Sequence, residues 1–97
     1  MKRPKILLFK SHSIVSKVTG VTPPLGLLYI AAALRERLGA DVRVIVAMLE
    51  NDPMNVMVST LRHFRPDVVG ISALTAEAFF AHKAAAAVKA EAPSVPV

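Results

Sequence analysis

Residues 23–46, PPLGLLYIAAALRERLGADVRVIV, have the pattern of a helix that leads directly into a β-strand. Pro24 suits the first turn of a helix, where its missing N–H is not needed, and Gly39 suits the position just past a helix end. The apolar spacing between them predicts a helix over residues 25–38. Its expected buried face consists of Leu27, Ile30, Ala31, Leu34 and Leu38. The alternating valines that follow predict a strand over residues 41–47.

Strand and helix patterns continue to alternate on both sides of this segment. Short apolar runs predict further strands, and the Asp52-Pro53 pair is a typical helix start. The remaining predicted elements are a strand at 5–10, a helix that starts at Asn51-Asp52-Pro53 and is ended by Pro66, a strand at 67–73 and a helix from Thr75 to about Glu91. This order predicts an α/β fold, a Rossmann- or flavodoxin-like doubly wound parallel sheet.

The last residues have the pattern of a further strand. Val95-Pro96-Val97 follows a helix-ending proline and reads as the start of strand four, at which point the sequence ends. We therefore expect residues 1–97 to be part of one α/β domain, truncated after the third β-α unit. In the usual strand order the third strand would then lie at an open edge, and an open apolar edge favours pairing with a second copy of the chain. A homo-oligomer is the expected result.

The composition excludes several classes of protein. With 54% hydrophobic and 20% charged residues, the chain is too apolar to be disordered. The absence of cysteine excludes disulfides, zinc-thiolate sites and iron–sulfur ligation within these residues. The net charge is +5, but the basic residues are scattered and do not alternate with aromatic ones, so nucleic acid is not an expected partner. No membrane span is expected either, because the longest apolar run, residues 25–34, is too short. The lack of cysteine agrees with a cytoplasmic protein, which is the expected location.

A ligand site is expected where the strands end. In open α/β sheets, ligands bind outside the carboxyl ends of the strands, which selects the long loop at residues 11–24 and the segment at residues 72–75. Both segments offer hydroxyls and backbone amides. Neither contains G-x-G-x-x-G or a P-loop, and Lys10 and Ser11 stand where a receiver domain would have acidic residues. These absences argue against NAD, ATP and phospho-acceptor functions.

Three segments together resemble the N-terminal cobalamin (B12)-binding domain of B12-dependent radical SAM enzymes. They are KILLF at residues 5–9, PPLGLLYIAAALRERLGADVRVI at residues 23–45 and FRPDVVGISALT at residues 64–75. The resemblance implies cobalamin as cofactor. It also implies a parent enzyme, of the methyltransferase or oxidative cyclase type, such as anaerobic magnesium-protoporphyrin IX monomethyl ester cyclase-like proteins. The radical SAM domain of that parent would hold a 4Fe-4S cluster and S-adenosylmethionine, so no activity is expected from this chain alone.

The resemblance also implies which residues touch the cofactor. Many cobalamin domains carry S-x-L after the third strand and, after the first, D-x-H-x-x-G, whose His ligates cobalt. Ser72-Ala73-Leu74 matches S-x-L, whereas D-x-H-x-x-G is matched only at His12, because Lys10 replaces its Asp and Val15 its Gly. The expected cofactor contacts are Ser11, His12, Ser13, Ser72, Ala73, Leu74 and Thr75, with His12 as a candidate axial ligand of cobalt.

Two other functions remain open at this stage. The chain could be a Rossmann-like recognition or assembly domain that binds no cofactor, which the departures from D-x-H-x-x-G weakly favour. It could also be a flavodoxin-like enzyme or signalling domain. The missing phosphate loop and the missing acidic cluster argue against this function. Retention of a corrin or of a flavin separates these functions.

Overall fold

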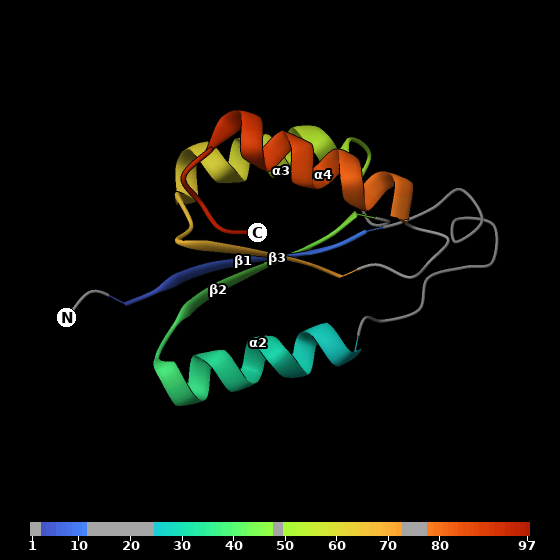
Figure 1. Ribbon diagram of the computed structural model, residues 1–97. Coiled ribbons are helices and arrows are strands. Elements are labelled where there is room, and N and C mark those ends of the chain that lie inside the picture. Colours follow the sequence, from blue (N-terminus) through green and yellow to red (C-terminus); the bar gives the residue numbers. More distant parts are fainter. Residues whose placement is uncertain (1–2, 12–24, 48–49, 73–77) are drawn as a thin grey trace.

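The computed structural model describes residues 3–11, 25–47, 50–72 and 78–97 of the chain. Within them, three strands alternate with three helices (Figure 1). The elements are β1 (Lys5–Lys10), α2 (Leu25–Leu38), β2 (Asp41–Val46), α3 (Pro53–Phe64), β3 (Val68–Ser72) and α4 (Ala78–Glu91). These bounds agree with the predicted elements to within one residue at most ends. The predicted start of the last helix, at Thr75, lies outside the described residues.

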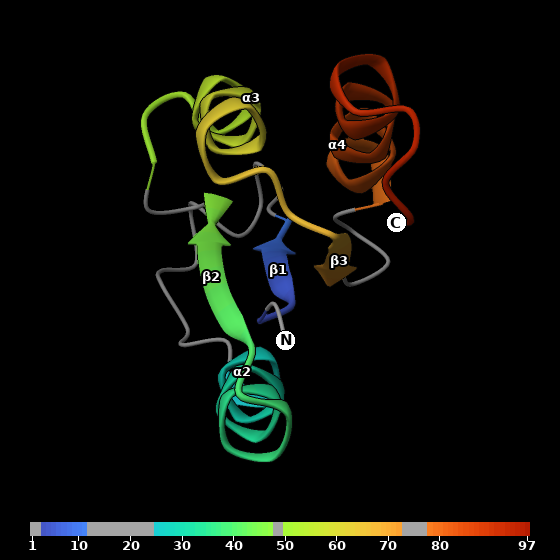
Figure 2. The same ribbon diagram turned by 90° about the vertical axis from the view of Figure 1, so that its left-hand side faces the viewer.

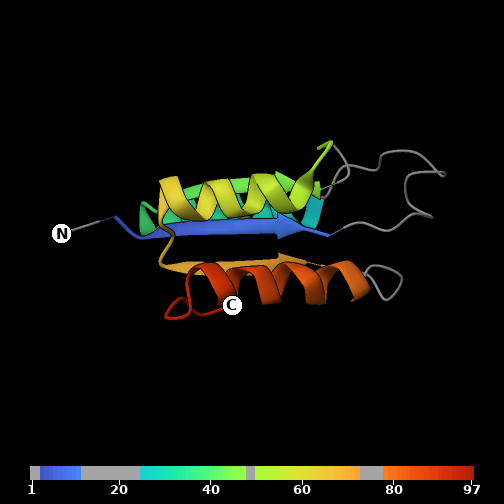
Figure 3. The ribbon, with the colours of Figure 1, turned by 90° about the horizontal axis from the view of Figure 1, so that it is seen from above.

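The three strands form one parallel sheet in the order β2-β1-β3. Helix α2 covers one face of this sheet, and α3 and α4 cover the other (Figures 1 and 2). Helix α3 lies over β2 and β1, and α4 lies beside it over β3 (Figures 2 and 3). The predicted doubly wound α/β fold is confirmed.

Both faces of the central strand β1 are buried, as expected for parallel strands. The larger core lies between the sheet and helices α3 and α4, and its buried residues are Leu7, Phe9, Ile45, Ala47, Met57, Leu61, Val69, Ala84 and Val88. The smaller core lies under α2 and consists of Leu8, Leu27, Ala31, Ala40 and Val42. Odd and even residues of β1 therefore face opposite sides of the sheet, as strand geometry requires.

The helix ends have the chemistry that the sequence predicts. The Asp52 carboxylate accepts a hydrogen bond from the N–H of Asn55 at 3.2 Å, and Pro53 occupies the first turn of α3. Gly39 follows α2 with a φ of 61°, a left-handed conformation that glycine adopts without strain. Arg65 ends α3 in the same conformation, with a φ of 53°, and its N–H bonds to the carbonyl of Leu61. None of the described helices is long and apolar enough to cross a membrane.

The predicted buried face of α2 is only partly correct. Leu27 and Ala31 are buried, but Ile30 and Leu38 are 52% and 60% exposed. The reason is the position of α2, which lies under β2 and β1 rather than under β3 (Figure 2). Side chains of α2 that do not point toward these two strands stay exposed, and Leu38 lies in the last turn of the helix.

The predicted fourth strand is not formed by residues 95–97, which are in no regular strand. They do lie against β3, because the Pro96 carbonyl accepts a hydrogen bond from the N–H of Val69 at 2.9 Å. Val95 packs against the larger core, and its carbonyl accepts a bond from Lys89 Nζ at 3.1 Å. Pro96 has no N–H to donate, which prevents regular pairing at that residue.

Self-association through the edge strand β3 stays a prediction. Light scattering at high protein concentration tests it, and a monomeric mass would count against it.

Candidate functional site

The three strands end side by side at the carboxyl edge of the sheet. Their last residues form one row, because Lys10 of β1 pairs in register with Val46 of β2 and with Ser72 of β3. Just beyond this row, the N–H of Ser11 donates to the carbonyl of Ser72 at 2.9 Å. This is the edge at which an open α/β sheet binds its ligands.

Two of the seven predicted contact residues lie within the described part of the chain, and the structure brings them together. Ser11 is 2% exposed and Ser72 is half-buried, and the backbone bond between them joins the ends of β1 and β3. The other predicted contacts fall outside the described residues: His12, Ser13, Ala73, Leu74 and Thr75. The role of His12 as a cobalt ligand therefore stays a prediction.

Lys10 is a further polar residue of this edge. Its side chain is half-buried, and its Nζ donates to the carbonyl oxygen of Ser11 at 3.2 Å. In the sequence, Lys10 was noticeable only as a departure from two motifs, the acidic residues of receiver domains and D-x-H-x-x-G. Its position at the end of a buried central strand is the signal that would have identified it, because a charged residue there must lie beside the ligand edge.

The side of the sheet that these residues face is fixed by strand alternation. Ile6 and Leu8 belong to the core under α2, so Lys10 faces the same side. Val69 and Ile71 pack in the other core, so Gly70 and Ser72 face the α2 side. A Cβ atom added to Gly70 would lie 2.9 Å from Leu8 Cδ2, which shows that glycine leaves room for the Leu8 side chain here.

No preformed metal centre is found among the described residues. They contain no group of three or more His, Cys, Asp or Glu side chains that could hold an ion. His63 on α3 and His82 on α4 are both exposed, and the Nδ1 atom of His63 lies 2.8 Å from the carbonyl oxygen of Ser59 in its own helix. Both histidines are therefore surface residues of the helices.

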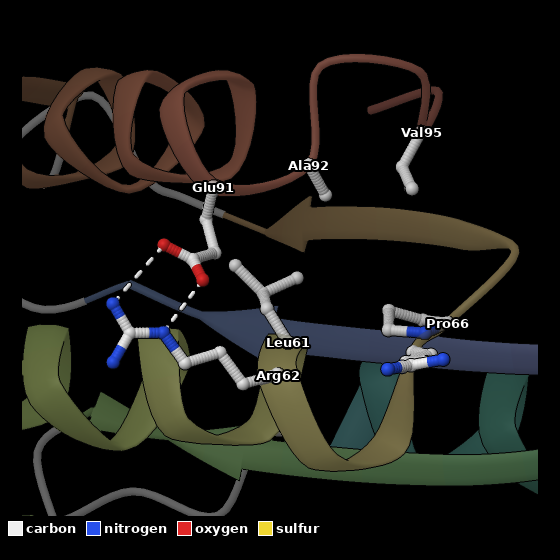
Figure 4. Close-up of a pocket in the computed structure, with 7 residues that line it drawn as sticks. Leu61, Arg62, Pro66, Glu91, Ala92 and Val95 are labelled. Atoms are coloured by element: carbon white, nitrogen blue, oxygen red, sulfur yellow. Dashed lines mark hydrogen bonds and ion pairs between the residues drawn. The ribbon is translucent and has the colours of Figure 1, made fainter.

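A cavity of about 390 Å³ lies at the opposite, amino edge of the sheet (Figure 4). It is open to solvent and lies between the C-terminal ends of α3 and α4 and the segment that follows α4. Its lining residues are Leu61, Arg62, Arg65, Pro66, Glu91, Ala92 and Val95. Arg62 Nε donates to Glu91 Oε1 at 2.6 Å, and Nη2 donates to Oε2 at 3.4 Å. The hydrogen bond between the two side chains lowers the pKa of the Glu91 carboxyl and raises the pKa of the Arg62 guanidinium.

This cavity has a structural explanation. Cations near the C-terminal end of a helix are favoured by the helix dipole, and Arg62 is in the last turn of α3. The Arg62–Glu91 pair joins the two helices across the cavity mouth. The carboxyl edge, not this cavity, is therefore the candidate ligand site.

Comparison with known proteins identifies the family to which this chain belongs. The family model of the B12 binding domain matches residues 11–97. The chain belongs to the B12-binding domain family. An uncharacterised methyltransferase of Pyrococcus horikoshii is 38% identical over 88 residues, which are 88% of this chain and 19% of that protein. This B12-binding domain thus spans about a fifth of that relative's length, and no solved structure matches it significantly.

The described residues of this B12-binding domain fit part of a cobalamin molecule. Cobalamin is an extended ligand with an apolar macrocycle, amide side chains and a nucleotide tail that carries a phosphodiester. The carboxyl edge supplies the Ser72 hydroxyl and the Lys10 ammonium for its polar groups. The fit to the cofactor therefore rests on these polar groups of the edge.

Proposed function

We propose that this chain is the cobalamin-binding module of a larger B12-dependent radical SAM enzyme, and that it holds the cofactor at the carboxyl edge of its sheet. The observation that carries this proposal is the B12-binding family match over residues 11–97. That stretch includes the edge where Ser11 and Ser72 are joined. Serine hydroxyls and backbone amides at strand ends are suitable partners for the amides and the nucleotide tail of a corrinoid.

Bound cobalamin supplies a cobalt centre for alkyl-transfer or redox chemistry. The residues proposed here bind and orient it, and the reaction itself belongs to the parent enzyme, where a radical SAM domain would hold the 4Fe-4S cluster and S-adenosylmethionine. The chain has no cysteine with which to bind such a cluster. The methyltransferase name of the archaeal relative supports methyl transfer as the parent's reaction, with oxidative ring formation of the magnesium-protoporphyrin cyclase type as the alternative.

A titration with hydroxocobalamin, followed by gel filtration, tests the proposed function. We expect corrin to elute with the 97-residue chain and the visible spectrum of the bound corrin to differ from that of the free form. A chain that elutes without corrin at every concentration would contradict the proposal. The chain would then be a Rossmann-like recognition or assembly domain without a cofactor.

We also propose His12 as the axial ligand of cobalt. Replacement of His12 with alanine is expected to change the visible spectrum of the bound corrin, because an imidazole nitrogen leaves the coordination sphere. The matched control is His82→Ala, which removes an exposed imidazole from α4. A His12→Ala spectrum identical to that of the unchanged chain would show that the protein holds cobalamin without this histidine.

A further inference from the structure

The charge at the carboxyl edge points to one more feature of the ligand site. Of the residues that end the three described strands, Lys10, Val46 and Ser72, only Lys10 is charged. It ends the central strand, and its two register partners flank it. A cation at the centre of this row attracts an anionic group of a ligand at this edge.

Lys10 and Ser72 are placed to act on the same group. Both side chains face the α2 side of the sheet, and they come from neighbouring strands whose paired residues lie about 5 Å apart. The Ser72 hydroxyl can donate one hydrogen bond, and an ammonium has three donors. The bond from Lys10 Nζ to the Ser11 carbonyl, at 3.2 Å, is therefore compatible with a second acceptor on the ligand.

We propose that Lys10, together with the Ser72 hydroxyl, binds the phosphodiester of the cofactor's nucleotide tail. This inference rests on the proposed function, since it concerns the same cobalamin. The phosphodiester is the anionic group of that ligand, and a lysine ammonium is a common point-charge contact for phosphate. In this role Lys10 selects corrinoids that carry the complete nucleotide tail over those that lack it.

A comparison of two corrinoids with two lysine variants tests this assignment. Hydroxocobalamin has the nucleotide tail, whereas diaquocobinamide lacks both the base and the phosphodiester. Lys10→Met removes the charge and keeps most of the side-chain length, and Lys10→Arg keeps the charge. Lys89→Met is the matched control, because Lys89 Nζ also donates to a backbone carbonyl, that of Val95 at 3.1 Å, but at the amino edge.

We expect Lys10→Met to weaken hydroxocobalamin binding by about tenfold, the usual effect of losing a hydrogen bond to a charged group. It should leave cobinamide binding unchanged within about twofold, and Lys10→Arg should retain most of the affinity for both ligands. Added salt should reduce the difference between the two ligands, since it screens a partly exposed charge. Lys89→Met should bind both ligands like the unchanged chain.

Three results would overturn the assignment. If Lys10→Met weakens both corrinoids equally, Lys10 supports the edge structurally and does not contact the phosphodiester. If Lys10→Met binds hydroxocobalamin as tightly as the unchanged chain does, Lys10 makes no contribution, and the proposed function still stands. If the unchanged chain binds neither corrinoid, the proposed function fails together with this inference. Circular dichroism of each variant, and the charge-retaining Lys10→Arg, separate loss of contact from loss of fold.

Discussion

Replacement of Phe9 with alanine is expected to remove a large part of the stability of this domain. Phe9 lies in the central strand, is fully buried, and packs in the larger core between the sheet and helices α3 and α4. Loss of a buried phenylalanine side chain costs about 3–5 kcal/mol, because it forfeits the transfer free energy and leaves a cavity. The free energy of unfolding of a whole protein is only about 5–15 kcal/mol. This one change should therefore lower the urea midpoint strongly or leave the chain unfolded.

The matched control for this change is Phe79→Ala. Phe79 is 68% exposed near the start of α4, where its ring makes an edge-to-face contact with Phe80 at 5.3 Å and lies 5.6 Å from Lys83 Nζ. Surface substitutions of this kind usually change stability by no more than about 0.5 kcal/mol. Urea unfolding followed by circular dichroism measures both variants. Equal effects at Phe9 and Phe79 would show that β1 is not the centre of the core.

A second large loss of stability is expected from Val88→Asp. Val88 is fully buried on the side of α4 that packs on β3, within the same core as Val69. An unpaired carboxylate at such a position is destabilising by about 3–5 kcal/mol or becomes protonated at a comparable cost. The variant should therefore unfold at much lower urea concentration than the unchanged chain, and its stability should recover in part below the pKa of the new carboxyl.

Ala86→Asp is the control for helix propensity, because Ala86 is an exposed residue of the same helix. Aspartate is less favourable than alanine in a helix interior by less than about 1 kcal/mol, so only a small shift is expected. If Ala86→Asp destabilised the chain as much as Val88→Asp, then α4 would not pack on the sheet through the face that contains Ala84 and Val88.

The order of elements was predictable because each type of element has its own local signature. The helix over residues 25–38 was delimited by Pro24 before it and Gly39 after it, and the structure has the same bounds. The Asp52-Pro53 pair predicted the start of α3 for a physical reason that the structure confirms, the side-chain cap on Asn55. Helix signals of this kind depend on neighbouring residues, so a single sequence contains them.

The packed faces of α2 and α4 were less predictable because their sequences are apolar or small on most sides. In α2 a continuous apolar run obscures the difference between Leu27, which is buried, and Ile30, which is half-exposed. In α4 a run of alanines offers several equivalent faces. Only the position of each helix over particular strands determines which side is buried, and that position depends on residues far apart in the sequence.

The proximity of two candidate site residues was predictable from the sequence, whereas the neighbouring Lys10 was not selected. The rule that ligands bind at the carboxyl ends of parallel strands selected Ser11 and Ser72, and the structure joins them by a hydrogen bond at 2.9 Å. Lys10 ends the predicted first strand, but only the register shows that it lies beside Ser72. Register follows from packing between strands, which no local pattern in the sequence reports.

The most direct test of a cobalamin site at the carboxyl edge is to follow backbone amide resonances by NMR during titration with hydroxocobalamin. The amides of Ser11 and Ser72 report on the carboxyl edge, and those of Arg65 and Asp67 report on the amino edge, beyond the other end of β3. A strand extends by about 3.3 Å per residue, which makes the two pairs well separated. We predict saturable shifts at Ser11 and Ser72 with little change at Arg65 and Asp67. Shifts confined to the amino edge, or none at any ratio of cofactor to protein, would contradict the account.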